Sequence, residues 1–221
     1  MRGMFPTALA LVAVATFAQD VAKLAPKNVK VLFENDRVRV LQFNEPGHTK
    51  LAMHSHPAYV AVGFTADHSK YTFPDGKTSD ERSKINDVTY SKSLTHASEN
   101  LSDAVSETVM VELKKPGAAT TKTALDPVKL DPKHYSVVLE NDEVRVLRAK
   151  YGAGEKSVMH EHPASVAVSL TDYHMKMNLA DGKAQDVTSK AHDATWSDAG
   201  KHLPENIGGK PVEVIVIELK K

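Results

Sequence analysis

The sequence predicts an all-β protein built from two tandem barrels, and three observations carry this prediction. The chain repeats itself once at a fixed offset, its apolar residues alternate with a period of two, and no segment longer than about ten residues shows a helical period of 3.6. A chain of 221 residues is long enough to bury the core of one large domain or of two small ones. The repeat favours two small domains.

The repeat becomes visible when the chain is aligned with itself at an offset of 106 positions. Residues 20–115 then match 126–221 without a gap, and 42 of the 96 pairs are identical. The join at 116–125, "PGAATTKTAL", opens on Pro-Gly and lacks apolar periodicity, which is typical of a linker. We therefore predict an N-terminal barrel over 20–115 and a C-terminal barrel over 126–221.

Short strands account for the pattern within each half. Segments such as "VRVLQF", "AYVAVGF" and "VEVIVIEL" alternate or run as β-branched stretches, and turn signals such as Asp75-Gly76 and Asp181-Gly182 separate them. This indicates eight or nine strands in each half, the scale of a sandwich or of a small closed barrel.

The first 18 residues have the features of a secretory signal peptide. Arg2 precedes an apolar run from Ala8 to Val14, and the small residues Thr16 and Ala18 follow. The apolar run is shorter than the roughly 20 residues of a membrane-spanning helix, which is the alternative. We expect a periplasmic or secreted protein without stable membrane insertion after signal cleavage. Since the chain has no cysteine, no disulfide can support the fold.

The charge balance argues against a nucleic-acid or lipid partner. The 28 basic and 28 acidic residues cancel, and removal of residues 1–18 takes away one base, which gives 27 − 28 = −1. No Ser-His-Asp order, glycine-rich phosphate loop or basic aromatic stripe is present. The partner is therefore expected to be a small molecule or another protein.

Histidines form the candidate site in each half. His54 and His56 lie in "MHSHP", and the same pair recurs in "MHEHP". Alternate residues of a strand point to one face about 6.6 to 7 Å apart, so such a pair can converge on one metal ion. A third histidine follows forty residues after the second in each half. The six candidate metal ligands are His54, His56, His96, His160, His162 and His202. The alternative is that they pack at the barrel mouth, hydrogen-bonded to one another and to water.

The second half resembles the cupin superfamily, whose motifs are Gly-x5-His-x-His-x3,4-Glu-x6-Gly and Gly-x5-Pro-x-Gly-x2-His-x3-Asn. Gly154, His160 and His162 match the first motif, and His202 and Asn206 match the end of the second. The resemblance implies jelly-roll (double-stranded β-helix) barrels and covers both repeats, so the chain looks like a bicupin.

The first half matches the same motifs with one substitution at a glycine. His54, His56, His96 and Asn100 are in place, but His48 stands at the glycine position. Since the second copy keeps its flanks better, it is the one in which we first expect a site.

Both halves depart from the cupin motifs in the same way. The glutamate ligand of many cupins would fall at Val60 or Ala61, and at Val166 or Ala167 in the repeat. The second motif is also imperfect, because Gly200 lies one place late and the first half reads "SKSLTH". The resemblance therefore implies metal held by nitrogen alone, with open positions for water or an anion.

Two hypotheses follow for the function. The first is an exported bicupin that binds a divalent first-row transition metal (Fe, Mn, Zn or Ni) through three histidines per barrel and acts on or binds a small molecule. As an enzyme it would be dioxygenase-like, or it would use metal-bound water for hydrolysis or isomerisation. The alternative is a non-catalytic ligand-binding or structural module without metal. Because cupin-like barrels often associate through sheet faces, a homodimer is one assembly open to this chain.

Other residues receive structural interpretations. His68 and His174 are expected at the surface, because the alternation in "YHMKMNL" directs the methionines inward. Tyr90 and the corresponding Trp196 are expected to pack. Tyr59 has the opposite parity to His56 and is expected outside the barrel.

Overall fold

The structure is a computed structural model that describes residues 19–114 and 124–220. The predicted signal peptide, residues 1–18, lies outside the described residues, as does the predicted linker apart from its last two positions. The signal peptide and the domain boundaries therefore stay predictions. In the described part of the chain, no helix has the length and the apolar character to cross a membrane.

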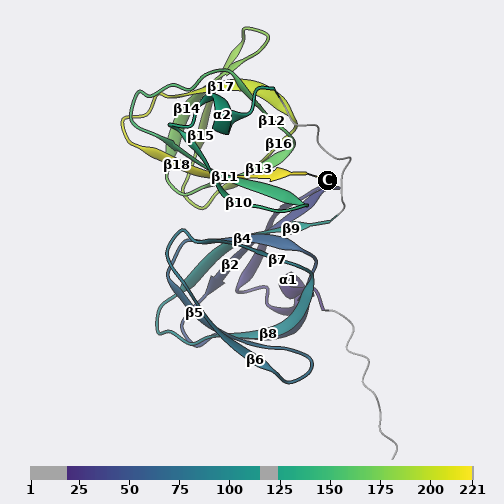
Figure 1. Cartoon of the computed structure of the whole chain (residues 1–221). Helices are drawn as coiled ribbons and strands as arrows, with labels where there is room; N and C mark the ends of the chain where they lie inside the picture. Colours follow the sequence, from purple (N-terminus) through teal and green to yellow (C-terminus); the bar gives the residue numbers. More distant parts are fainter. Residues whose placement is uncertain (1–18, 115–123, 221) are drawn as a thin grey trace, which may run out of the picture.

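The first half begins with one short helix and continues as nine strands (Figure 1). The elements are α1 (Val21–Leu24), β1 (Val29–Glu34), β2 (Val38–Glu45), β3 (Lys50–His56), β4 (Tyr59–Gly63), β5 (Asp67–Thr72), β6 (Thr78–Ser83), β7 (Val88–Ser91), β8 (Leu94–Asn100) and β9 (Ser106–Leu113).

The second half repeats this order. The elements are α2 (Pro127–Leu130), β10 (Tyr135–Glu140), β11 (Val144–Tyr151), β12 (His160–His162), β13 (Ser165–Ser169), β14 (Tyr173–Leu179), β15 (Ala184–Ser189), β16 (Ala194–Ser197), β17 (Gly200–Asn206) and β18 (Val212–Leu219). The predicted strand number and the all-β class are confirmed, whereas the two short helices were not predicted.

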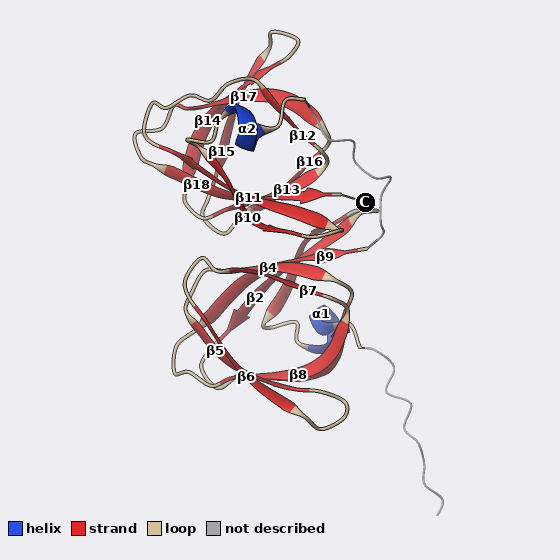
Figure 2. Ribbon diagram, viewed as in Figure 1, coloured by secondary structure: helices blue, strands red, loops and turns tan. Residues whose placement is uncertain are grey.

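Each half folds into one five-stranded and one four-stranded antiparallel sheet (Figure 2). The first half has the orders β1-β2-β9-β4-β7 and β3-β8-β5-β6, and the second half has β10-β11-β18-β13-β16 and β12-β17-β14-β15. All strand pairings of the described chain stay within one half. This is the jelly-roll arrangement that the resemblance implied, and it agrees with the sandwich or small barrel that the period-two pattern predicted.

The five-stranded sheets are apolar on both faces because both faces are covered. In β2, Leu41 and Phe43 point into the first barrel, whereas Val38 and Val40 belong to a core that joins the two halves. The alternation therefore hides a second buried face, which explains why these strands read as nearly continuous apolar runs.

The two five-stranded sheets pack against each other, with β2, β4 and β9 beside β10, β11 and β13 (Figure 1). Tyr90 and Trp196 pack against this shared core, as predicted. Polar contacts add to it, since the Tyr90 hydroxyl donates to Glu143 and the Arg148 guanidinium donates to the Asn86 carbonyl at 2.6 Å. Each barrel keeps its other sheet free of this interface.

Candidate metal centres

The six predicted histidines come together as two triads, one in each barrel, and all of them are buried except His202, which is half-buried. His54 and His56 lie on β3 and face His96 on β8, where His54 and His96 are direct cross-strand partners. The pairing of His160 on β12 with His202 on β17 repeats this geometry. In each triad the candidate ligand atoms lie within 4.8 Å of one another.

Backbone carbonyls fix the orientation of the first histidine of each triad. The Nδ1 atom of His54 lies 2.7 Å from the carbonyl oxygen of Ala52, and that of His160 lies 2.8 Å from the carbonyl oxygen of Val158. Because a carbonyl only accepts, Nδ1 carries the proton in both rings. The Nε2 lone pair of each ring is therefore directed into its triad, where that of His54 lies 3.2 Å from Nε2 of His96.

A buried carboxylate fixes the second histidine in each barrel. The Nδ1 atom of His56 donates to Glu112 Oε1 at 2.7 Å, and that of His162 donates to Glu218 Oε1 at 2.7 Å. Within the described residues, the buried Nε2 atom of His56 has no hydrogen-bond partner. A buried ring nitrogen without a partner costs free energy, so this atom points to a missing ligand.

Each of these carboxylates is supported by an arginine from the neighbouring strand. Arg39 lies 3.8 Å from Glu112 and binds Asp20, the N-cap of α1, at 3.0 Å. The second barrel repeats the contacts with Arg145, which lies 3.6 Å from Glu218 and 3.0 Å from Asp126, the N-cap of α2. Each barrel therefore has the same series of charged contacts, from the N-cap aspartate of the helix through an arginine and a glutamate to the second histidine of the triad.

Sequence reasoning did not assign a role to Glu112 or Glu218. The signal that could have found Glu112 is its position in "VMVEL", where it has the same parity as Met110, a residue packed inside the barrel. A charged residue on the inner face of an apolar strand needs a buried partner. That partner, His56, lies 56 residues away in the chain.

Four of the six triad imidazoles are held in the neutral form that binds metals. Burial, together with the charges of the other two imidazoles of each triad, lowers the pKa of His96 to about 3 and that of His202 to about 3. Burial also lowers the pKa of His54, and that of His160 to about 4. Metal binding at neutral pH therefore needs no prior deprotonation of these four rings.

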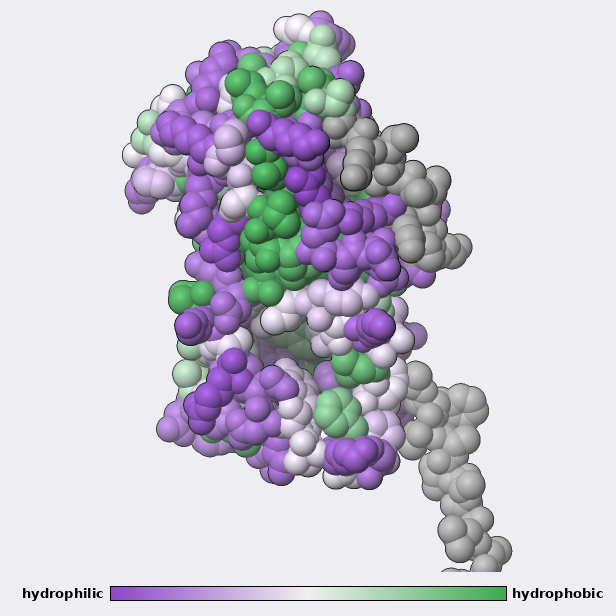
Figure 3. Space-filling model, viewed as in Figure 1, coloured by the Kyte–Doolittle hydropathy of each residue, from purple (hydrophilic) through white to green (hydrophobic). Residues whose placement is uncertain are grey.

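The first triad opens into a cavity of about 410 Å³. Figure 3 shows the surface of the first barrel, the lower half of the view, hollowed between the strands. The cavity is lined by the three histidines, by Phe43, Tyr59, Tyr71 and Phe73, and by the acidic residues Glu45, Asp67, Glu81 and Asp87. A small organic molecule fits such a space beside the triad.

The expected outward position of Tyr59 is wrong. Tyr59 lines the cavity, and its ring packs edge-on against His56 with centroids 5.5 Å apart. Pro57 and Ala58 lie between β3 and β4, and the two strands belong to different sheets. The alternation of inward and outward side chains therefore begins anew with β4. The direction of His56 on β3 does not predict the direction of Tyr59.

Glu45 is an unusual group in the first cavity. Burial, and then the charge of Asp67, raise the pKa of Glu45 to about 7. Within the described residues, the buried Oδ1 atom of Asp67 has no hydrogen-bond partner. The two carboxyl groups thus lie close together in the same cavity as the triad.

Replacing Glu45 by glutamine is expected to stabilise the metal-free protein at pH 8. The carboxyl has a higher pKa in the folded than in the unfolded chain, so ionised Glu45 disfavours folding as the pH rises from about 4.5 through 7. After allowance for solvent screening we expect a gain of about 1 to 3 kcal/mol at pH 8 and none below pH 4.5. Urea unfolding of both proteins at the two pH values measures it. An equal difference at both pH values would contradict the assignment.

Tyrosine side chains contact the second triad at His160, whereas His202 is half-buried. The Tyr135 hydroxyl lies 3.0 Å from Nε2 of His160, and the Tyr151 hydroxyl donates to it at 2.7 Å. Because Nδ1 of His160 carries the proton, Tyr135 must be the donor to Nε2. Met175 and Met177 fill the neighbouring space. The metal-facing atom of His160 is therefore already hydrogen-bonded.

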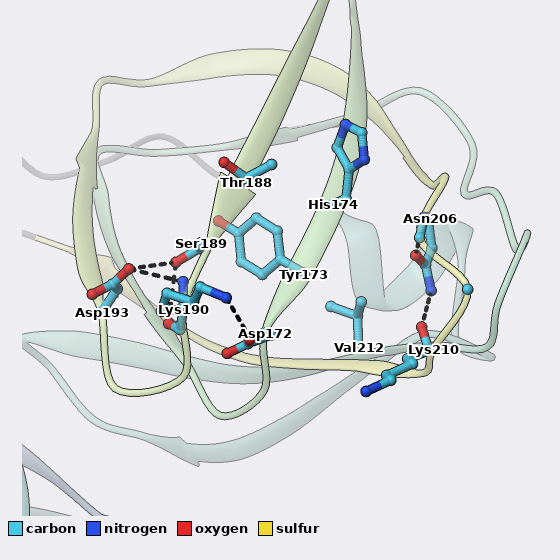
Figure 4. Close-up of a pocket in the computed structure, with 12 residues that line it drawn as sticks. Asp172, Tyr173, His174, Thr188, Ser189, Lys190, Asp193, Asn206, Lys210 and Val212 are labelled. Carbon is cyan, nitrogen blue, oxygen red and sulfur yellow. Dashed lines mark hydrogen bonds and ion pairs between the residues drawn. The ribbon is translucent and has the colours of Figure 1, made fainter.

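A second cavity, of about 610 Å³, lies on the second barrel (Figure 4). No triad histidine belongs to its lining, and the ring of Tyr173 lies amid the labelled side chains. Five of its residues correspond, at the 106-residue offset, to residues of the first cavity. These pairs are Tyr173 with Asp67, Thr188 with Arg82, Ser189 with Ser83, Asp193 with Asp87, and Val212 with Ser106. This cavity therefore differs from the first one in that its lining contains no candidate metal ligand.

The remaining motif residues have backbone roles. The Asn100 side-chain amide donates to the Glu45 carbonyl at 3.0 Å, and that of Asn206 donates to the Gly152 carbonyl at 2.9 Å. At the motif glycine, Gly154 has φ +74° and His48 has φ +63°. His48 thus adopts the left-handed conformation that glycine adopts without strain.

The two other paired histidines lie at the surface, as predicted. His68 pairs with Asp80 at 2.9 Å, and His174 lies 3.5 Å from Asp186. Neither residue belongs to a triad.

The comparisons with solved structures agree with this fold. AerE from Microcystis aeruginosa superposes with a TM-score of 0.65 at 10% identity, over 88% of this chain and 93% of that one. Oxalate decarboxylase from Bacillus subtilis, a protein with Mn(II) centres, superposes with a TM-score of 0.59 at 12% identity, over 86% and 71%. The structure of the same decarboxylase at pH 4.6 gives 0.60 at 13% identity, over 90% and 70%. No protein-family model and no curated protein matches the chain.

Taken with the two jelly-roll barrels, these likenesses establish a cupin fold. The chain therefore has a two-barrel cupin fold with a histidine triad in each barrel.

Proposed function

We propose that the protein binds a divalent first-row metal ion through its histidine triads and acts on a small organic molecule at the first barrel. The observation that carries the proposal is the unpartnered, buried Nε2 atom of His56, which lines the same cavity as His54 and His96. Neutral imidazoles with Nδ1 anchored are the usual form of histidine ligands. The donor set therefore fits a metal ion.

The donor chemistry favours Fe, Mn, Zn or Ni over Ca or Mg, because imidazole nitrogen suits the transition metals. Three neutral nitrogens leave the full charge of the ion and several open coordination positions. A bound metal would supply Lewis-acid or redox chemistry to a ligand oxygen. The chain itself orients that ligand between the triad and the aromatic residues Tyr59 and Tyr71 of the cavity.

The structural likeness to an oxalate decarboxylase with Mn(II) centres supports metal binding more than it supports oxalate as the substrate. Cupin folds host many chemistries, so function has to be argued from the site. Here the first cavity holds Glu45 and Asp67, whose negative charge opposes a dianion such as oxalate. We therefore propose a substrate other than a dicarboxylate.

A non-catalytic role is favoured for the second barrel by one observation. The Tyr135 hydroxyl occupies Nε2 of His160, and the nearby cavity does not include the second triad. The second barrel would then hold a metal ion without admitting a substrate, or would act as a structural module. We also propose export to the periplasm or the cell exterior, which mass spectrometry of the N-terminus of the protein purified from its source would test.

Metal titration of the purified two-barrel protein tests the proposal. After treatment with a chelator and dialysis, the protein is titrated with Zn²⁺, Mn²⁺, Fe²⁺ and Ni²⁺, and the bound ions are counted by elemental analysis. We expect up to two ions per chain, with one bound more readily than the other, because there are two triads and in the second one Nε2 of His160 is hydrogen-bonded to Tyr135. A well-folded sample that takes up no metal at any concentration would overturn the proposal.

Replacing Tyr135 by phenylalanine is expected to strengthen metal binding in the second barrel. The change frees Nε2 of His160 from a hydrogen bond worth about 1 kcal/mol, which corresponds to roughly a fivefold higher affinity. Calorimetric titration with Zn²⁺ measures it, and Tyr90→Phe serves as a control that removes a hydroxyl bound to Glu143 rather than to a triad histidine. Weaker binding in Tyr135→Phe would instead indicate that the hydroxyl is itself a ligand.

A further inference from the structure

Two acidic side chains in the first cavity have no part in holding a metal ion. Glu45 lies at the end of β2 and Asp67 at the start of β5, and both line the cavity that contains the triad. The Asn100 amide holds the Glu45 carbonyl, which fixes the backbone at the point where this carboxyl enters the cavity. The fold therefore fixes the points at which these two side chains enter the cavity.

Tyr71 connects the two carboxyl groups with the triad. The Tyr71 ring stacks on His96, with centroids 5.0 Å apart and planes inclined by 21°. Burial raises the pKa of the Tyr71 hydroxyl, and the charges of Asp67 and Glu45 raise it further. The negative charges of both carboxyl groups thus affect a tyrosine whose ring contacts a triad histidine.

The second barrel lacks this arrangement. At the 106-residue offset, Tyr151 stands in place of Glu45 and Tyr173 in place of Asp67. Tyr151 donates to Tyr135, which binds His160, and Tyr173 lines a cavity that contains no triad histidine, whereas the carboxyl groups line the cavity that contains the first triad. The carboxyl pair and the open site therefore occur together.

We propose that Glu45 and Asp67 form a proton-transfer pair for a ligand bound at the first triad, with Glu45 as the group that exchanges the proton. This rests on the proposed function, and it narrows the substrate to a small neutral or singly charged molecule with a protonatable oxygen. Asp67 acts as a positioning residue, because its negative charge keeps the proton on Glu45.

The transfer involves one proton and no change of oxidation state. The O–H bond of the Glu45 carboxyl breaks, an O–H bond forms on the ligand oxygen, and Glu45 is left as a carboxylate. The electron pair of the broken bond stays on Glu45. Solvent that enters through the cavity mouth returns the proton to Glu45.

Other charged or titratable groups face this pair from every strand around the cavity. They are His54 and His56 on β3, Tyr59 on β4, Tyr71 on β5, Glu81 and Arg82 on β6, Tyr90 on β7 with Asp87 before it, and His96 on β8, while β9 places Ser106 opposite Glu45. A test must therefore compare single substitutions rather than the pH dependence of the wild type alone.

Proton release on zinc binding provides such a test in the intact protein. A divalent ion at the triad should force Glu45 to lose its proton, so at pH 6.5 the wild type should release up to about one proton more per chain than Glu45→Gln. Calorimetry with Zn²⁺ in buffers of different ionisation enthalpy counts these protons. Asp67→Asn should also release fewer protons than the wild type, and the control Glu99→Gln, a substitution on β8 at the surface, should match the wild type.

The outcomes separate this inference from the proposed function. Zinc binding with equal proton release in the wild type and in Glu45→Gln overturns the inference and leaves the proposed function standing. No zinc binding overturns the proposed function. If Glu45→Gln does not fold, carbon-13 NMR of the glutamate carboxyl groups in the wild type decides, because a carboxyl that titrates at the ordinary value for glutamate overturns the inference.

A second measurement tests the substrate class. Zinc-loaded protein is titrated with oxalate and with acetate at pH 8, where both carboxyl groups are charged. In the double variant Glu45→Gln with Asp67→Asn, we expect oxalate affinity to rise roughly tenfold and acetate affinity to rise less, because a dianion feels twice the repulsion. Unchanged affinity for both anions overturns the assignment of the pair to this cavity.

Discussion

Replacing His54 by alanine is expected to remove the metal ion of the first barrel, so that the number of bound ions falls by one per chain. His54 supplies one of only three ligands, and in metal sites even the loss of a residue behind a ligand lowers affinity by roughly 10- to 100-fold. We therefore expect the affinity of the first site to fall by roughly 100-fold or more. The same change at His160 should empty the second site and spare the first.

Elemental analysis after dialysis, together with calorimetric titration with Zn²⁺, measures both effects. The chain provides matched controls, since His68 and His174 also correspond across the repeat, pair with surface aspartates and lie outside the triads. His68→Ala and His174→Ala should keep the metal content of the wild type. If His54→Ala and His160→Ala both leave the metal content unchanged, the ligand assignment is wrong.

The triads could be predicted because their geometry is local. In a strand, residues two apart share a face, so His54 and His56 had to point the same way. The third ligand needed only an antiparallel neighbour in register, which β8 provides by pairing His96 with His54. The repeat then fixed the second triad without further information.

The charged support behind the triads could not be predicted in the same way. Glu112 meets His56 only because β9 and β3, in different sheets, close over the same barrel interior. Sequence patterns give the face of each strand but not which strands of two sheets meet. The pairing of Arg39 with the cap residue Asp20 depends on a four-residue helix, which is too short for a periodic signal.

The position of Tyr135, which distinguishes the second barrel from the first, could not be predicted from the sequence for a related reason. Tyr135 replaces Val29, yet the register of β10 against β11 shifts between Val137 and Leu139, so alternation does not fix which way Tyr135 points. The second copy matches the motif better because it has a glycine, Gly154, where the first copy has His48. This difference concerns the backbone only, since both residues adopt a positive φ. It carries no information on whether the triad is open, and the structure places the open triad in the first barrel.

Replacing Glu112 should have a large effect on both stability and metal binding. Glu112→Ala leaves the Nδ1 atom of His56 without an acceptor and removes a buried partner of Arg39. Breaking a buried ion pair typically costs 3 to 5 kcal/mol, and we expect about 3 kcal/mol because Arg39 keeps its contact with Asp20. Urea or thermal unfolding of the metal-free protein measures this loss.

The isosteric change Glu112→Gln separates orientation from charge. The glutamine oxygen can still accept from His56 Nδ1, so the ring stays in place, but the negative charge that raises the basicity of Nε2 is lost. Zinc affinity of the first site should then fall by roughly 10- to 100-fold with a smaller loss of stability. Glu218→Gln should weaken only the second site, and Glu99→Gln neither. If Glu112→Gln keeps the wild-type affinity while Glu112→Ala loses it, the carboxylate acts by positioning His56 alone, and its charge has no part in metal binding.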